Sequence, residues 1–112
     1  MDAPLTRQDP QDALRDHYSR LVARDRELRE SRGLEGPHLH MVAWDAGRLA
    51  GLAFALGHAA EVRGWLQSAA EAARVALSRD PWVSGRLAVS YLAVAAAGDD
   101  AALVGAVGRA RM

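Results

Sequence analysis

Alanine is the residue that most constrains how this chain can fold, because it occurs 24 times in 112 positions. Alanine has the highest helix propensity of all residues, and leucine, arginine, glutamate and glutamine follow closely. Residues that favour strands are scarce, since the sequence has nine valines, one threonine and no isoleucine. We therefore predict an all-α protein of about five helices, arranged as antiparallel hairpins.

Glycine and proline divide the sequence into segments of helical length. Asp9-Pro10 and Asp80-Pro81 each predict a helix start, because aspartate caps helices and proline suits the first helical position. Gly33, Gly64 and Gly98 are placed where helices end. The predicted helices cover residues 10–32, 38–63, 66–79, 82–97 and 100–110. We interpret residues 1–9 as a flexible lead-in and residues 10–112 as a single α-helical domain, with a charged helix over 10–32 and a hairpin body over 38–111.

The first predicted helix differs in charge from the rest of the chain. Residues 7–32 hold seven arginines and six acidic residues. Its apolar stripe consists of Leu14, Tyr18, Leu21 and Leu28, and Asp25 interrupts the series. This spacing is typical of a helix that packs along one narrow seam and exposes its other faces to water.

The later helices are mostly apolar. Residues 38–63 carry apolar side chains on several faces, which predicts a central, buried helix. The last helix consists mainly of alanine, valine, leucine and glycine. We expect its outer surface to be covered, either by the first helix folding back onto it or by another subunit.

An internal repeat is visible in the second half of the chain. Gly64 and Gly98 are 34 residues apart, which is the tetratricopeptide period. The positions that match that pattern are Leu56-Gly57, Gly64, Ala69, Ala76, Asp80-Pro81, Gly98-Asp99 and Ala110. Residues 50–112 therefore resemble a degenerate pair of tetratricopeptide-like helical hairpins. The resemblance implies that a peptide or helix is captured in a groove between stacked hairpins.

Composition excludes several classes of function. The sequence has no cysteine, so disulfides, thiolate metal sites and cysteine nucleophiles are excluded. Fourteen basic and 14 acidic residues cancel, which argues against binding to nucleic acid or to an anionic membrane. No apolar run approaches the ~20 residues of a membrane span, and the first residues lack the pattern of a secretory signal. We expect a soluble, cytoplasmic protein.

No group of side chains in the sequence is typical of a catalytic centre. The leading interpretation is a small non-catalytic protein–protein interaction module, such as an adaptor, a secretion-type chaperone, or an inhibitor or immunity protein of a GC-rich bacterium. Tryptophan, tyrosine and arginine dominate the energetics of interfaces. The predicted partner contacts are Tyr18, Trp65, Trp82, Arg86 and Tyr91. We expect a partner protein, with a homo-oligomer as a further possibility, and no cofactor.

The alternative is a helical-bundle enzyme or a metal- or ligand-binding protein. His58 and Glu61 are three residues apart and so share a helix face, and Asp45 could supply a third ligand. Metal sites need three or four converging ligands, and only this one pair shares a face by spacing. The sequence therefore predicts no metal, and stoichiometric metal in the purified protein would favour the alternative.

Overall fold

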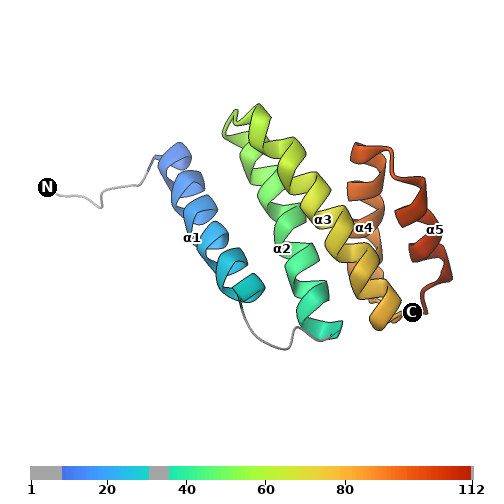
Figure 1. Ribbon diagram of the computed structural model, residues 1–112. Coiled ribbons are helices and arrows are strands. Elements are labelled where there is room, and N and C mark those ends of the chain that lie inside the picture. The colour runs from blue at the N-terminus through green and yellow to red at the C-terminus, as the bar shows by residue number, and fades with distance from the viewer. Residues whose placement is uncertain (1–8, 31–35, 112) are drawn as a thin grey trace, which may run out of the picture.

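The computed structural model describes residues 9–30 and 36–111, which form five α-helices (Figure 1). The predicted all-α class is confirmed. The helices are α1 (Pro10–Glu30), α2 (Gly36–Ala55), α3 (Ala59–Arg79), α4 (Gly85–Gly98) and α5 (Ala101–Arg109). Most of the lead-in predicted over residues 1–9 lies outside the described residues.

The turn between α2 and α3 lies at residues 56–58, which corrects the predicted boundary at Gly64. Gly57 has a φ of 76°, a left-handed conformation that glycine adopts without strain. The His58 amide then donates to the Ala53 carbonyl at 2.8 Å, which closes the turn. Gly64 instead lies within α3, so the helices predicted over 38–63 and 66–79 had the wrong boundaries. The hairpin turn that the tetratricopeptide pattern places at Gly64 is absent from this position.

The turn between α4 and α5 lies where the sequence predicts it. Asp99 has a φ of 52° and ends α4 in the left-handed conformation, and the Asp100 side chain caps α5 by accepting from the Leu103 amide. The start of α4 is Gly85 rather than residue 82, because Ser84 is the residue that caps it. Pro81 and Val83 lie in an extended segment that pairs with Arg111 in two backbone hydrogen bonds.

Alanine forms much of the contact between α2 and α3. Ala46, Ala73 and Ala76 are completely buried, and small side chains allow two helix axes to approach closely. The main core joins Ala46 and Ala73 to Leu103 on α5 and to Tyr91 on α4. A smaller core lies under α1, where Tyr18 and Leu21 meet Leu49 and Ala53.

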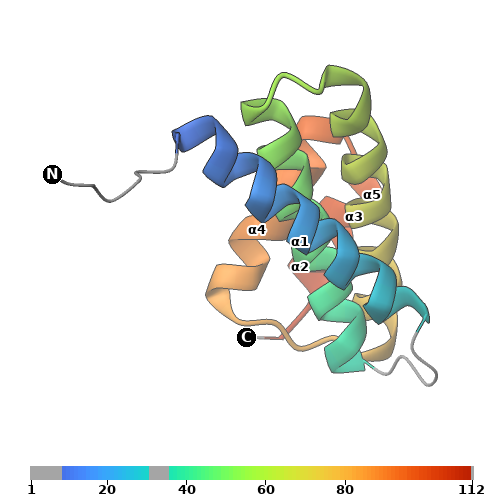
Figure 2. The ribbon, with the colours of Figure 1, turned by 90° about the vertical axis from the view of Figure 1, so that its left-hand side faces the viewer.

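The helix α1 packs on α2, at the opposite end of the row of helices from α5 (Figure 1). Figure 2 shows α1 in front of α2. The described part of α1 makes no contact with α5. The prediction that the first helix folds back over the last one is therefore wrong, because the narrow seam of α1 is already used on α2.

Gly64 provides a test of the corrected boundary. A Cβ added there would meet no atom within 4 Å, so Gly64→Ala adds helix propensity without a clash. We expect the free energy of unfolding to rise by about 1 kcal/mol, measured by urea denaturation. A turn at Gly64 would give the opposite result, a loss of stability.

Candidate partner-binding site

A groove runs between the α2–α3 hairpin and α4. Two cavities of about 860 and 340 Å³ share four lining residues and so form one continuous depression. The shared residues are Val62, Leu66, Val94 and Ala97. The helix α3 has 21 residues and α4 only 14, which makes α4 about 10 Å shorter. The shorter helix covers only part of the hairpin, and the uncovered part forms one wall of the groove.

The α2 side of this groove is lined by small residues and ends at an exposed aromatic ring. Gly47, Ala50 and Gly51 line it, and a Cβ added at Gly51 would meet no atom within 4 Å. Phe54 also lines the groove, and its side chain is 77% exposed. Small residues therefore lie beside a large, exposed apolar ring on this side of the groove.

Charged residues of both signs surround the wider end of the groove. These residues are Arg63, Glu71, Arg74, Asp99 and Asp100. Arg74 pairs with Asp100, which joins α3 to the residue that caps α5. An apolar centre with a charged rim is the usual anatomy of a protein interface.

The five contacts predicted from the sequence lie outside this groove. Tyr91 is only 1% exposed and Tyr18 is also buried, so neither presents its ring to a partner. Trp65 is half-buried and packs on both apolar clusters. Trp82 and Arg86 are exposed, Trp82 by 58%.

Tyr18 connects α1 to α3 through a chain of hydrogen bonds. Its hydroxyl donates to Glu61 Oε1 at 2.5 Å and accepts from Trp65 Nε1 at 2.9 Å. Burial, followed by the bond to Glu61, raises the pKa of Tyr18, so the hydroxyl keeps its proton. His58 Nδ1 lies 3.2 Å from Glu61 Oε2, so the predicted pairing of these two residues on one face is confirmed.

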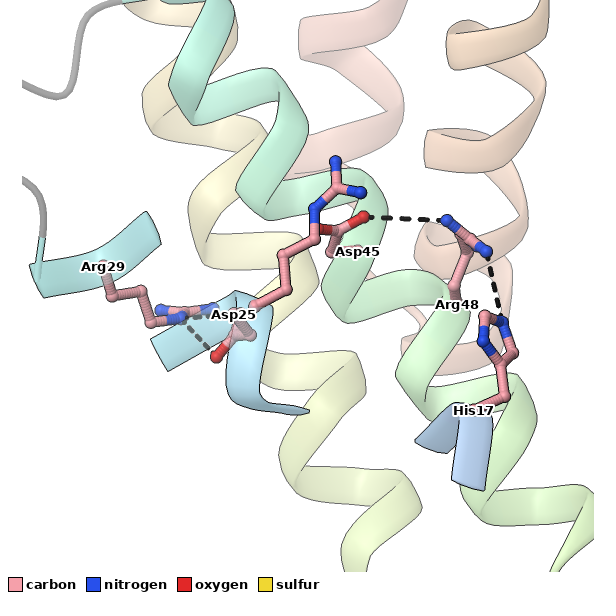
Figure 3. A network of polar contacts seen from close by, with 6 residues as sticks. His17, Asp25, Arg29, Asp45 and Arg48 are labelled. Atoms are coloured by element: carbon pink, nitrogen blue, oxygen red, sulfur yellow. Dashed lines mark hydrogen bonds and ion pairs between the residues drawn. The ribbon is translucent and has the colours of Figure 1, made fainter. Parts of the chain in front are cut away.

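Asp45 is the buried carboxylate of the α1–α2 contact. Its side chain is 3% exposed, and its Oδ2 lies 2.9 Å from Arg24 Nε without accepting a well-aligned hydrogen bond. Arg48 lies between Asp45 and His17 in Figure 3, with its Nη1 3.8 Å from Asp45 Oδ1. Burial raises the pKa of Asp45 more than the charges of Arg24 and Arg48 lower it.

Asp25 interrupts the apolar series of α1 and is buried in the same contact. Arg29, one turn later on α1, donates from Nε to both carboxylate oxygens at 2.9 and 3.0 Å (Figure 3). The pairing within one helix explains how a carboxylate can occupy a position of the buried seam.

His40 and Tyr91 join α2 to α4 inside the core. His40 Nε2 lies 2.9 Å from the Asp80 carbonyl, which can only accept, so Nε2 carries the proton. Nδ1 therefore accepts from the Tyr91 hydroxyl at 2.7 Å. Burial raises the pKa of Tyr91, which stays a neutral donor. Both nitrogens of His40 are occupied by structural hydrogen bonds.

No described residues form a group of three or more metal-ligating side chains. The alternative interpretation needed Asp45 beside His58 and Glu61, but Asp45 is paired with Arg24 and Arg48 instead. Within the described helices, none is both long and apolar enough to cross a membrane. Comparisons with family models, with curated proteins and with solved structures find no match to this chain.

Tyr18→Phe tests the connection between α1 and α3. The variant keeps the ring but leaves Trp65 Nε1 and Glu61 without their shared partner, which costs about 1 kcal/mol of unfolding free energy. Hydrogen exchange should become faster in α1 and stay unchanged in α4 and α5. Faster exchange spread evenly over all helices would contradict a local role for this hydroxyl.

Asp45→Asn tests the balance between burial and ion pairing. The raised pKa means that unfolded Asp45 loses its proton at lower pH than folded Asp45, so the ionised group destabilises the fold at neutral pH. The asparagine variant lacks this effect. Its unfolding free energy relative to the natural protein should therefore rise from acid to neutral pH in urea titrations.

Asp12→Asn is the reference for removal of an exposed carboxylate of α1 that pairs with a single arginine, Arg15. A relative stability of Asp45→Asn that falls as the pH rises would show that Arg24 and Arg48 outweigh burial.

Proposed function

We propose that this protein is a small, non-catalytic interaction module that binds a helical segment of a partner protein in the groove between α2, α3 and α4. The observation that carries the proposal is Phe54, an aromatic side chain left 77% exposed at the edge of an apolar depression. Large apolar side chains that line a concave surface mark sites of association more often than isolated exposed residues do.

The lining residues favour a helix as the bound element. Gly51 and Ala50 allow a backbone to approach α2, while Val62 and Leu66 offer apolar surface on α3. An amphipathic helix with apolar side chains at positions i, i+3, i+4 and i+7 suits such a groove. The rim of mixed charge then contributes to orientation and selectivity.

Adaptors, secretion-type chaperones and inhibitor or immunity proteins all work through contacts of this kind, and a cytoplasmic location belongs to the same proposal. A tetratricopeptide-like mode of helix capture remains part of the proposal, although the turn that this pattern places at Gly64 lies at residues 56–58 instead. Trp82 and Arg86 remain proposed as contacts outside the groove, because both are exposed.

Two substitutions in the groove test this function. Phe54→Glu removes the anchor, and Gly51→Gln fills the floor at a position where a side chain meets open space. Affinity capture from a lysate of the source cells should retain a partner on the natural protein and lose it on both variants. A photoreactive phenylalanine analogue at position 54 should crosslink to the same partner.

Gly64→Gln is the matched control, because Gly64 is also an exposed helical glycine with free space around it but does not line the groove. It should retain the partner. A docking role for the groove would be contradicted if the natural protein and all three variants retained the same proteins. It would also be contradicted if none of the four retained a partner.

A further inference from the structure

A cavity of about 320 Å³ lies where α1 meets α2, and it shares none of its described lining residues with the groove. This volume is near the lower end of the range of about 300–1,000 Å³ that is typical of small-molecule sites. Residues three and four apart are neighbours on a helix, so positions 41, 44, 45 and 48 share one face of α2. The lining residues are Arg24 on α1 and His40, Met41, Trp44, Asp45 and Arg48 on α2.

Asp45 is the buried charged residue of this cavity. Its side chain is only 3% exposed, and within the described structure its Oδ2 accepts no well-aligned hydrogen bond. A buried acceptor without a hydrogen bond is unusual and unfavourable. Burial also raises the pKa of Asp45 in spite of the two arginines, so the ionised carboxylate opposes folding. A buried acid of this kind that lines a cavity is typical of a binding site, where a ligand supplies the donor.

Two arginines place positive charge beside this carboxylate. Arg24 Nε lies 2.9 Å from Asp45 Oδ2, and Arg48 lies next to Asp45 in Figure 3. The contact of Arg24 with Asp45 uses Nε, which leaves the two Nη groups of this half-exposed side chain for a ligand. Guanidinium groups bind carboxylates through paired hydrogen bonds, so this part of the cavity suits the acid group of a ligand.

The charges that line the cavity favour a ligand with one negative charge. Two guanidinium groups and one carboxylate leave a single positive charge. His40 adds none, because its Nδ1 accepts a hydrogen bond from the Tyr91 hydroxyl and is therefore unprotonated. A dianion such as phosphate would bring a second negative charge close to Asp45, which opposes its binding.

The remaining lining residues are apolar. Met41 is 40% exposed, and Trp44 is half-buried one turn further along the same face of α2. Indole rings and methionine sulfur both make favourable contacts with aromatic groups. This side of the cavity therefore suits an aromatic ring.

We propose that this cavity binds a small 2-hydroxy carboxylic acid with an aromatic ring. The carboxylate accepts hydrogen bonds from Arg24 and Arg48, the hydroxyl donates to Asp45 Oδ2, and the ring packs on Trp44 and Met41. Because Arg24 Nε and Asp45 Oδ2 are only 2.9 Å apart, a ligand that reaches both residues carries its acceptor and its donor on neighbouring atoms. The donor is a hydroxyl because an ammonium group there would be repelled by Arg24.

Titration calorimetry with 3-phenyllactate tests the proposal. For a ligand of about 12 non-hydrogen atoms we expect a dissociation constant of about 0.1 to 1 mM. 3-Phenylpropionate lacks only the hydroxyl and should bind about tenfold more weakly, because Asp45 then has no donor. Phenylalanine, which carries an ammonium group instead, and inorganic phosphate should also bind more weakly than 3-phenyllactate.

Three results of these titrations would overturn the proposal. The first is no heat of binding from 3-phenyllactate at about 10 mM, well above the expected dissociation constant. The second is an equal affinity for 3-phenylpropionate, which would show that Asp45 does not bind the hydroxyl. The third is tighter binding of phenylalanine or phosphate, which would assign the cavity to a different class of ligand.

Arginine variants place the ligand in this cavity. Arg24→Gln and Arg48→Gln remove a charged donor and should each weaken binding of 3-phenyllactate about tenfold. Arg26→Gln is the matched control, because Arg26 is exposed on α1 but does not line the cavity. An equal effect of all three variants, or of none, contradicts the assignment. If circular dichroism shows that Arg24→Gln does not fold, Arg24→Lys takes its place, since lysine keeps the charge but lacks the paired donors.

Discussion

The close approach of α2 and α3 through alanine is the contact on which the rest of the structure depends. Ala46, Ala73 and Ala76 lie fully buried between the two helices, and every other helix packs on this pair. Because alanine side chains are short, little apolar area is buried per residue and the contact gains its stability from length and close packing. The long α2–α3 hairpin is thus a rigid support, and the shorter α4 leaves part of its surface open as the groove.

The helices on the two sides of the α2–α3 hairpin are held by different kinds of interaction. On one side α1 is held by two buried apolar residues together with the hydrogen bonds of Tyr18 and the ion pairs of Asp45. On the other side α4 and α5 share the main apolar core. Polar contacts of this kind specify the position of α1 but add less stability than apolar burial would, since their desolvation opposes folding.

The sequence was sufficient to predict the helices, because helix propensity, helix-capping residues and helix-breaking residues act locally. It was insufficient to place the turn at Gly57, since Gly64 is a second helix-breaking residue in the same segment and the observed structure keeps it inside α3. The residues of the candidate site were harder to predict from the sequence than the helices. Phe54 lies in an apolar segment that predicts burial, but it is 77% exposed at the edge of the groove. Two of the aromatic residues predicted as contacts, Tyr18 and Tyr91, are buried and connect helices within the protein instead.

Two backbone hydrogen bonds between Arg111 and the segment before α4 close the α4–α5 hairpin into a loop. The Arg111 amide donates to the Pro81 carbonyl at 2.7 Å, and the Val83 amide donates to the Arg111 carbonyl at 2.9 Å. Helix ends normally fray residue by residue, but here the last described residue is fastened to the entrance of the hairpin. Because these two hydrogen bonds join the residues before α4 to the residue after α5, the two ends of the α4–α5 hairpin are linked to each other rather than left free.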